Sequence, residues 1–187
     1  PEGSCFSLGL MGVALVLVAS ILIPVGSPLH TSPKKANATK TCVELRTALM
    51  IYFSEYKQMP QLDDGRDFQA DTWNPDLIEA LVAWPDGSPT AIGINPRKVR
   101  FFSARTAKSK DSPGIWTGGD GRLRLSDPWG NPYQIKWDGN FDNAIEVPSM
   151  KGDGSTEILT TDIAVWSFGP NGELGRKDGR NDDVYAY

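Results

Sequence analysis

Cysteine and histidine are scarce in this 187-residue chain. It has two cysteines, Cys5 and Cys42, and one histidine, His30. A zinc cluster of Cys and His ligands, a Cys-His catalytic pair with an orienting third group, and a Ser-His-Asp triad all need more of these residues than the folded region offers. If the first part of the chain is helical, the two cysteines lie on the order of 50 Å apart, too far for a disulfide.

Positive charge is also in short supply. The 19 Lys and Arg residues are outnumbered by 23 Asp and Glu, which gives a formal net charge of -4. A nucleic-acid-binding protein normally carries an excess of Lys and Arg on one face, so we expect no nucleic-acid partner. No pair of carboxylates stands out as an acid and a base, and we expect no enzymatic activity.

One long apolar segment lies near the start of the chain. The run from Phe6 to Ile23 carries no charge, and its length is at the lower end of what crosses a bilayer core. A cleaved signal peptide normally has a basic region before the apolar run and a small-residue cleavage site after it. Neither feature flanks this run, and the other alternative is a buried helix of a soluble protein. The segment therefore predicts a retained membrane-spanning helix.

A second helix is expected after a break. Residues 24–33 include three prolines and a glycine, which interrupt helical hydrogen bonding. Ser32 followed by Pro33 has the form of an N-cap with proline at the first helical position, and the helix should end near Met59, before a proline. These signals divide the chain into a membrane and assembly segment, 1–33, and a head domain, 34–187. The apolar stripe of this helix consists of Cys42, Leu45, Leu49, Phe53 and Tyr56, widened by Val43, Met50 and Tyr52.

The head domain consists of short elements. Asn74 and Pro75 begin a short helix within residues 72–84. Asp138-Gly139-Asn140 is predicted to connect two strands as a hairpin, while residues 85–97 and 105–126 are long loops. Residues 126–132 are predicted to form a tight double turn. The overall prediction is an α+β fold in which the amphipathic helix covers a small antiparallel sheet. The runs expected to form strands are residues 98–104, 133–137, 143–147 and 162–168.

Several motifs along the chain resemble one family. They are F-S-L at 6–8, Y-F-S-E-Y-K-Q-M-P at 52–60, D-P-W-G-N-P-Y at 127–133 and W-S-F-G-P-N-G-E-L-G at 166–175. In this order they resemble the type IV pilin-like proteins, most closely the major pseudopilin of type II secretion (general secretion pathway protein G). The resemblance covers nearly the whole chain. It implies the pilin-like fold, with the membrane helix continuing after a break into the amphipathic helix.

The resemblance implies a function without catalysis. Such a subunit sits in the bacterial inner membrane as a single-pass protein, surrounded by lipid, with its head in the periplasm. It then joins copies of itself and other pseudopilins in a pseudopilus, supported by an inner-membrane assembly platform. A prepilin peptidase cleaves and methylates the N-terminus at the position of Phe6. The chain departs from the family pattern at Cys5, where glycine is usual, and at Leu10, where glutamate is usual.

The resemblance also implies a calcium site near the end of the chain. Calcium takes six to eight oxygen ligands from carboxylates, amides and backbone carbonyls. The residues alone favour a series of solvated turns for this glycine-rich acidic stretch, because Arg176, Lys177 and Arg180 would repel a cation. The ligands predicted from the family are the carbonyl of Phe168 and the side chains of Asn171, Asp178, Asp182 and Asp183.

An alternative function is a membrane-anchored periplasmic binding module that forms no fibre. The chain has six tryptophans, and Trp116 in the long loop could stack on a sugar or a protein partner. Most of the tryptophans are expected to belong to the core. An exposed Trp116 would favour the binding module over the fibre subunit.

Overall fold

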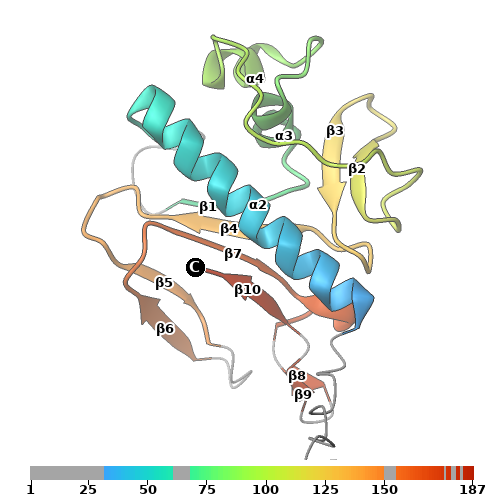
Figure 1. The fold of residues 1–187 in the computed structure, drawn as a ribbon, viewed down its shortest axis with the longest axis vertical. Coiled ribbons are helices and arrows are strands. Elements are labelled where there is room, and N and C mark those ends of the chain that lie inside the picture. Colours follow the sequence, from blue (N-terminus) through green and yellow to red (C-terminus); the bar gives the residue numbers. More distant parts are fainter. Residues whose placement is uncertain (1–31, 61–67, 150–154, 175, 178–179, 182) are drawn as a thin grey trace, which may run out of the picture. The chain divides into compact units, whose positions relative to one another are not determined.

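The computed structural model describes residues 32–60, 68–149, 155–174, 176–177, 180–181 and 183–187. The chain divides into two units, Pro1–Thr31 and Ser32–Tyr187, and every described residue belongs to the second. Figure 1 shows this unit as one long helix lying across a sheet, with smaller elements at both sides of the sheet.

The expected fold class needs a correction. In the part of the chain that the structure describes, no helix is both long enough and apolar enough to cross a membrane. The longest helix there, α2 (Pro33–Tyr56), exposes Lys40 and other polar side chains along one side, which a bilayer core would not accept. The predicted fold class, an α+β fold that includes a membrane-spanning helix, is therefore wrong. The described fold is α+β with antiparallel sheets, and residues 6–23 lie outside it.

Helix α2 begins where its sequence predicts and ends at Tyr56, three residues before the predicted end at Met59. The Ser32 side chain accepts a hydrogen bond from the backbone N–H of Lys35 at 3.2 Å, and Pro33 occupies the first turn. At the other end Lys57 adopts a left-handed conformation, and its N–H donates to the carbonyl of Phe53. One side of the helix is buried by Ala38, Cys42, Leu45, Ala48, Leu49 and Tyr52.

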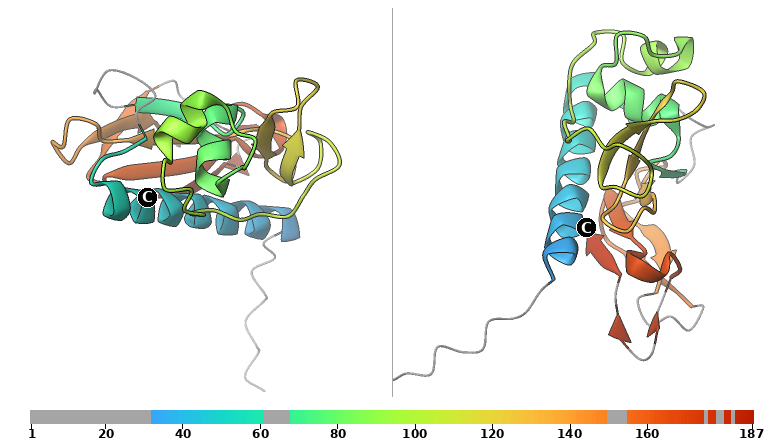
Figure 2. Two further views of the ribbon diagram at one scale, coloured as in Figure 1. Left: turned by 90° about the horizontal axis from the view of Figure 1, so that it is seen from above. Right: turned by 90° about the vertical axis from the view of Figure 1, so that its right-hand side faces the viewer.

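The main sheet has four antiparallel strands in the order β1-β4-β7-β10. Helix α2 covers one face of it (Figures 1 and 2). Because side chains alternate along a strand, Val165 of β7 joins the core under α2, and Trp166 joins a smaller cluster on the opposite face with Ile145 and Val147. Both faces are thus covered, which explains why β7 is buried along its whole length. The strands are β1 (Phe68–Asp71), β4 (Tyr133–Trp137), β7 (Ile163–Ser167) and β10 (Val184–Ala186).

The smaller elements lie at the margins of this sheet. Helices α3 (Pro75–Val82) and α4 (Pro89–Ile94) pack together, and the second lies within a region expected to be a loop. The other expected loop, 105–126, contains the hairpin of β2 (Gly114–Thr117) and β3 (Leu123–Ser126). The remaining elements are β5 (Ile145–Pro148) paired with β6 (Thr156–Leu159), the short 3-10 turn η2 (Gly169–Asn171), and β8 (Arg176–Lys177) paired with β9 (Arg180–Asn181).

Two strand predictions are wrong. Residues 98–104 form no strand, because the N–H groups of Phe101 and Phe102 both donate to the carbonyl of Leu81 at the end of α3. The predicted hairpin at 138–140 does not pair its neighbours, since β4 bonds to β1 and β7 while β5 bonds to β6. The Asp138 carboxylate instead accepts the N–H groups of Phe141 and Asn143, both at 2.6 Å, and closes a compact loop.

Candidate assembly surface and metal site

The outer face of α2 leaves three large apolar side chains open to solvent. Val43, Met50 and Ile51 are 50, 49 and 50 % exposed, and their spacing of seven and eight residues places them on one side. Thr47 lies between them, with its hydroxyl bonded back to the Val43 carbonyl at 2.8 Å. The sequence placed Val43 and Met50 at the margin of the apolar stripe, with burial expected only in the C-terminal half of the helix, and the structure places both side chains on the outside.

The inner face holds α2 rigidly against the rest of the fold. The Tyr52 hydroxyl donates to the carbonyl of Ile94 at 2.8 Å, and burial raises the pKa of Tyr52 to about 12. Arg46 reaches across to the Ile163 carbonyl of β7 at 3.3 Å. Burial also raises the pKa of the Cys42 thiol well above its usual range, so this cysteine is a packing residue and not a nucleophile. The open face is therefore presented on a fixed support.

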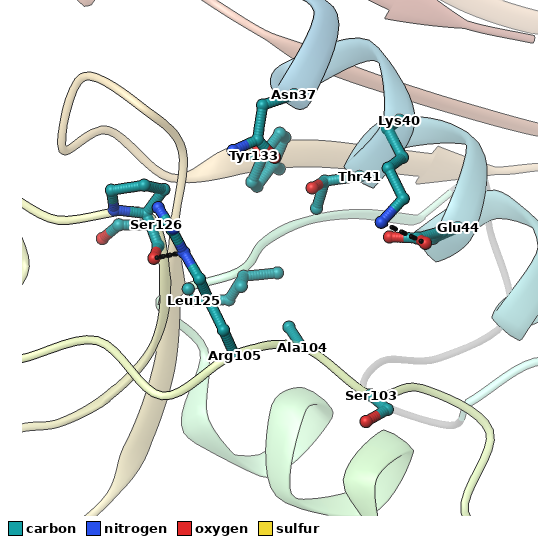
Figure 3. A pocket seen from close by; sticks show the side chains of 12 residues that line it. Asn37, Lys40, Thr41, Glu44, Ser103, Ala104, Arg105, Leu125, Ser126 and Tyr133 are labelled. Atoms are coloured by element: carbon teal, nitrogen blue, oxygen red, sulfur yellow. Dashed lines mark hydrogen bonds and ion pairs between the residues drawn. The ribbon is translucent and has the colours of Figure 1, made fainter. Parts of the chain in front are cut away.

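Two of the cavities that border the first half of α2 lie next to each other and share Glu44 and Ser103. The larger has a volume of about 480 Å³ and lies between this helix and residues 103–105 (Figure 3). Its charged groups already have partners: Lys40 forms an ion pair with Glu44 at 3.2 Å, and Arg105 Nε donates to the Pro113 carbonyl at 2.8 Å. The second, of about 280 Å³, continues beside Val43 along Phe101 and Phe102. Together they form a groove along the edge of the exposed helix face.

The D-P-W-G-N-P-Y motif forms the tight turn that was predicted, and its first residue organises it. The Asp127 carboxylate accepts the N–H groups of Trp129 and Asn131, both at 2.8 Å, and the Ser167 hydroxyl at 2.6 Å. Burial raises the Asp127 pKa, and these hydrogen bonds oppose that shift. Trp129 packs on the core, and Gly130 has a φ of 92° that favours glycine.

This turn also holds the start of the predicted calcium loop. The Asn131 side chain donates to the Gly169 carbonyl at 2.8 Å, and the Gly169 N–H donates to the Ser167 hydroxyl. Gly172 lies so close to Asn131 that an added Cβ would come within 3.1 Å of its side-chain oxygen. The D-P-W-G-N-P-Y turn and the start of the C-terminal loop therefore form one connected unit.

The structure describes three of the five predicted calcium ligands. Phe168 precedes η2, and Asn171 within it accepts the N–H of Glu173 at 3.1 Å. Asp183 is buried and accepts the Tyr185 hydroxyl at 3.2 Å, where burial and the neighbouring carboxylate raise the tyrosine pKa. Asp178 and Asp182 lie outside the described residues, as does Phe6, the predicted processing position. Among the residues that are described, no three acidic, Cys or His groups form a metal-binding cluster, so calcium remains a prediction.

Trp116 is less open than a sugar-stacking residue would be. Its indole N–H donates to the Ser126 hydroxyl at 2.9 Å, and the same hydroxyl accepts the indole N–H of Trp73 at 3.2 Å. The Arg124 guanidinium lies 5.6 Å from the centre of the Trp116 ring, in cation–π geometry. Through these contacts Trp116 stabilises the β2–β3 hairpin.

A partly buried ionic cluster was not foreseen from the sequence. Arg122 of the hairpin contacts Glu79 and Asp76 of α3, with distances of 2.7 Å and 2.6 Å. The only sequence signal was a glutamate, Glu79, within the apolar run of a short helix. The cluster joins α3 to β3 on the side of the sheet away from β5 and β6 (Figure 1).

We compared the chain with protein-family models, with curated proteins and with solved structures, and none of these comparisons finds a match.

Proposed function

We propose that this chain is a structural subunit of a fibre of the type II secretion pseudopilus or type IV pilus kind, with copies packing through helix α2. The observation that supports this most is the open apolar face of α2, where three large side chains are about half exposed on a helix held rigidly from behind. Apolar helix faces of this kind are typical of protein–protein contacts. A repeated subunit supplies such a face to its neighbours in every layer.

The arrangement of the rest of the head is compatible with this role. The inner side of α2 covers one face of the sheet and β5 and β6 cover the other, so the outer face of the helix remains available to a neighbouring subunit. The family motifs at 127–133 and 166–175 lie together in the fold, joined by the Asn131 and Ser167 hydrogen bonds. The proposal assigns no catalytic role to the chain.

Photo-crosslinking tests the proposal. A benzophenone amino acid is placed at Val43 or at Met50 of the full-length chain in bacterial cells, and the crosslinked products are separated by size. We expect a ladder of dimers and larger multimers of this chain from both positions. The matched control is Gly119, at an exposed hairpin tip where an added side chain meets open space. The proposal is overturned if the crosslinker yields monomers only, both at position 43 and at position 50.

A further inference from the structure

A basic segment crosses one side of this acidic protein. Residues 97–110 contain six Lys and Arg and no Asp or Glu. All six are exposed, and only Arg97 has a salt-bridge partner within the described chain, namely Glu55. The concentration of charge is unexpected in a chain with a net charge of -4. The six residues are Arg97, Lys98, Arg100, Arg105, Lys108 and Lys110.

An apolar pocket opens beside this basic segment. It has a volume of about 280 Å³, and Arg100 stands at its rim together with Trp84, which is 41 % exposed. A cavity of about 150 Å³ with apolar walls is enough to hold a benzene ring. The pocket can therefore accept one aromatic side chain with a negative charge next to it. Its apolar lining comes from Val82, Trp84, Phe102, Ile115 and Leu123.

The other side of the molecule carries the complementary features. The described residues of 138–162 include five carboxylates and no Lys or Arg, and none of the salt bridges found in the described chain involves them. Phe141, which is 65 % exposed, projects from the loop between β4 and β5 with Asp142 next to it. Exposed Glu146 follows on β5.

The backbone of this loop is strained in a way that presents Phe141. Its φ is 61°, a left-handed conformation that is rare for a bulky residue, and Asn143 has a φ of 63°. The two hydrogen bonds from these N–H groups to Asp138 hold the loop in place. Strained backbone conformations of this kind cluster at functional sites. An exposed aromatic ring held in a fixed position loses little freedom when it binds.

We propose that Phe141 of one copy inserts into the Trp84 pocket of the next copy, with Asp142 of the first facing Arg100 of the second. The loop leads into β5, on one side of the main sheet, and the pocket is lined from β2 and β3, on the other side (Figures 1 and 2). Each copy thus uses one surface to bind and the opposite one to be bound. A contact between two different surfaces produces a closed ring or an open filament, and the proposed fibre corresponds to the filament. This inference rests on the proposed fibre function, and it specifies the contact between neighbouring heads in that fibre.

Charge exchange in the full-length chain tests the contact. Asp142→Lys or Arg100→Glu alone should lower disulfide crosslinking between copies by about tenfold or more, because like charges then face each other. The crosslinked pair is Asn140→Cys, next to Phe141, and Thr106→Cys, at the pocket, which leaves the Phe141 ring and Trp84 in place. The double variant Asp142→Lys with Arg100→Glu restores opposite charges and should recover most of the yield. All variants carry Cys5→Ser, and their unfolding midpoints should match.

The two cysteines are also placed on separate chains produced in the same cells. We expect crosslinked dimers only when both chains are present, because Asn140→Cys alone would crosslink only in a symmetric dimer. Failure of the double variant to recover, or crosslinking of either chain alone, overturns the contact. If the benzophenone at Val43 still gives multimers in that case, the fibre forms without the Phe141 contact. If it gives none, both the fibre and the contact are contradicted.

Discussion

Glu79 and Arg122, 43 residues apart in the chain, are joined by two hydrogen bonds of 2.7 and 2.9 Å. Glu79 is only 2 % exposed, and its carboxylate also accepts the backbone N–H of Leu123 at 3.2 Å and of Ser88 at 3.1 Å. A single buried side chain therefore connects helix α3, the start of α4 and strand β3. The pocket beside Trp84 is lined by Val82 of α3 and Leu123 of β3, so its shape depends on this connection between the two elements.

Replacing Glu79 with alanine should destabilise the fold strongly. The change leaves two buried N–H groups without an acceptor and removes the main partner of the partly exposed Arg122, and we expect a loss of about 2 to 4 kcal/mol in the free energy of unfolding. Urea denaturation measures it. The matched control is Asp120→Asn, which breaks the exposed Asp120–Arg124 pair and should change the free energy of unfolding far less, because solvent screens this pair. Equal losses for the two variants would contradict this assignment.

Asp127 should make stability depend on pH. Its pKa is raised in the folded state, so the folded chain holds this proton at a pH where the unfolded chain has already lost it. The contribution of Asp127 to stability therefore falls as pH rises above the unfolded pKa of about 3.9. The Asp127→Asn variant keeps the acceptor for Trp129 and Asn131 but cannot ionise.

The measurement is the difference in free energy of unfolding between the parent chain and Asp127→Asn from pH 3 to pH 7. All other carboxylates are common to both proteins, so their effects cancel. We expect the parent to lose stability relative to the variant as the pH rises from about 4. A difference that stays constant, or that changes in the opposite direction, would show that the hydrogen bonds from Ser167 and the turn outweigh burial.

The helices were predictable because their signals are local. Ser32 with Pro33, and Asn74 with Pro75, supply a cap and a first-turn proline within a few residues. Ser88 with Pro89 repeats the pattern at α4, in a segment that its other residues made look like a loop. Helix ends are set by neighbouring residues, so sequence alone can locate them.

The strands were harder because a strand needs a distant partner. Residues 98–104 have the composition of a strand, but the carbonyl of Leu81 takes the N–H groups that a sheet would have used. The turn at 127–133 was predicted, whereas its bond to Ser167, 40 residues away, was not. The exposed positions of Val43 and Met50 also depended on which side of α2 meets the sheet, which the broad apolar stripe left undetermined.

Calcium should stabilise the full-length chain if the C-terminal loop binds it. A ligand at 100 times its dissociation constant adds about 2.7 kcal/mol, which corresponds to a rise of about 5 to 10 °C in the melting temperature for a chain of this size. Scanning calorimetry with calcium and with a chelator measures the shift. The Asp178→Asn variant should lose it, whereas Asp162→Asn, an exposed carboxylate outside the loop, should keep it. Identical melting temperatures in calcium and chelator would rule the site out.

Glycine usually lowers the stability of a protein relative to alanine. At position 141, where the backbone is left-handed, we expect the opposite order. Replacing Phe141 with alanine keeps the left-handed conformation and loses the ring contact with Phe53, whose centroid lies 6.0 Å away. Replacing it with glycine loses the same contact but relieves the strain, so the glycine variant should be more stable than the alanine variant by about 1 kcal/mol.

The control for Phe141 is Ala36→Gly in helix α2, where the backbone is helical and Ala36 is exposed. There glycine should be less stable than alanine by about 1 kcal/mol. Urea denaturation of the four proteins gives both differences. Opposite signs at the two positions would place the strain at residue 141, whereas the same sign would mean that the loop relaxes in solution and presents no fixed ring.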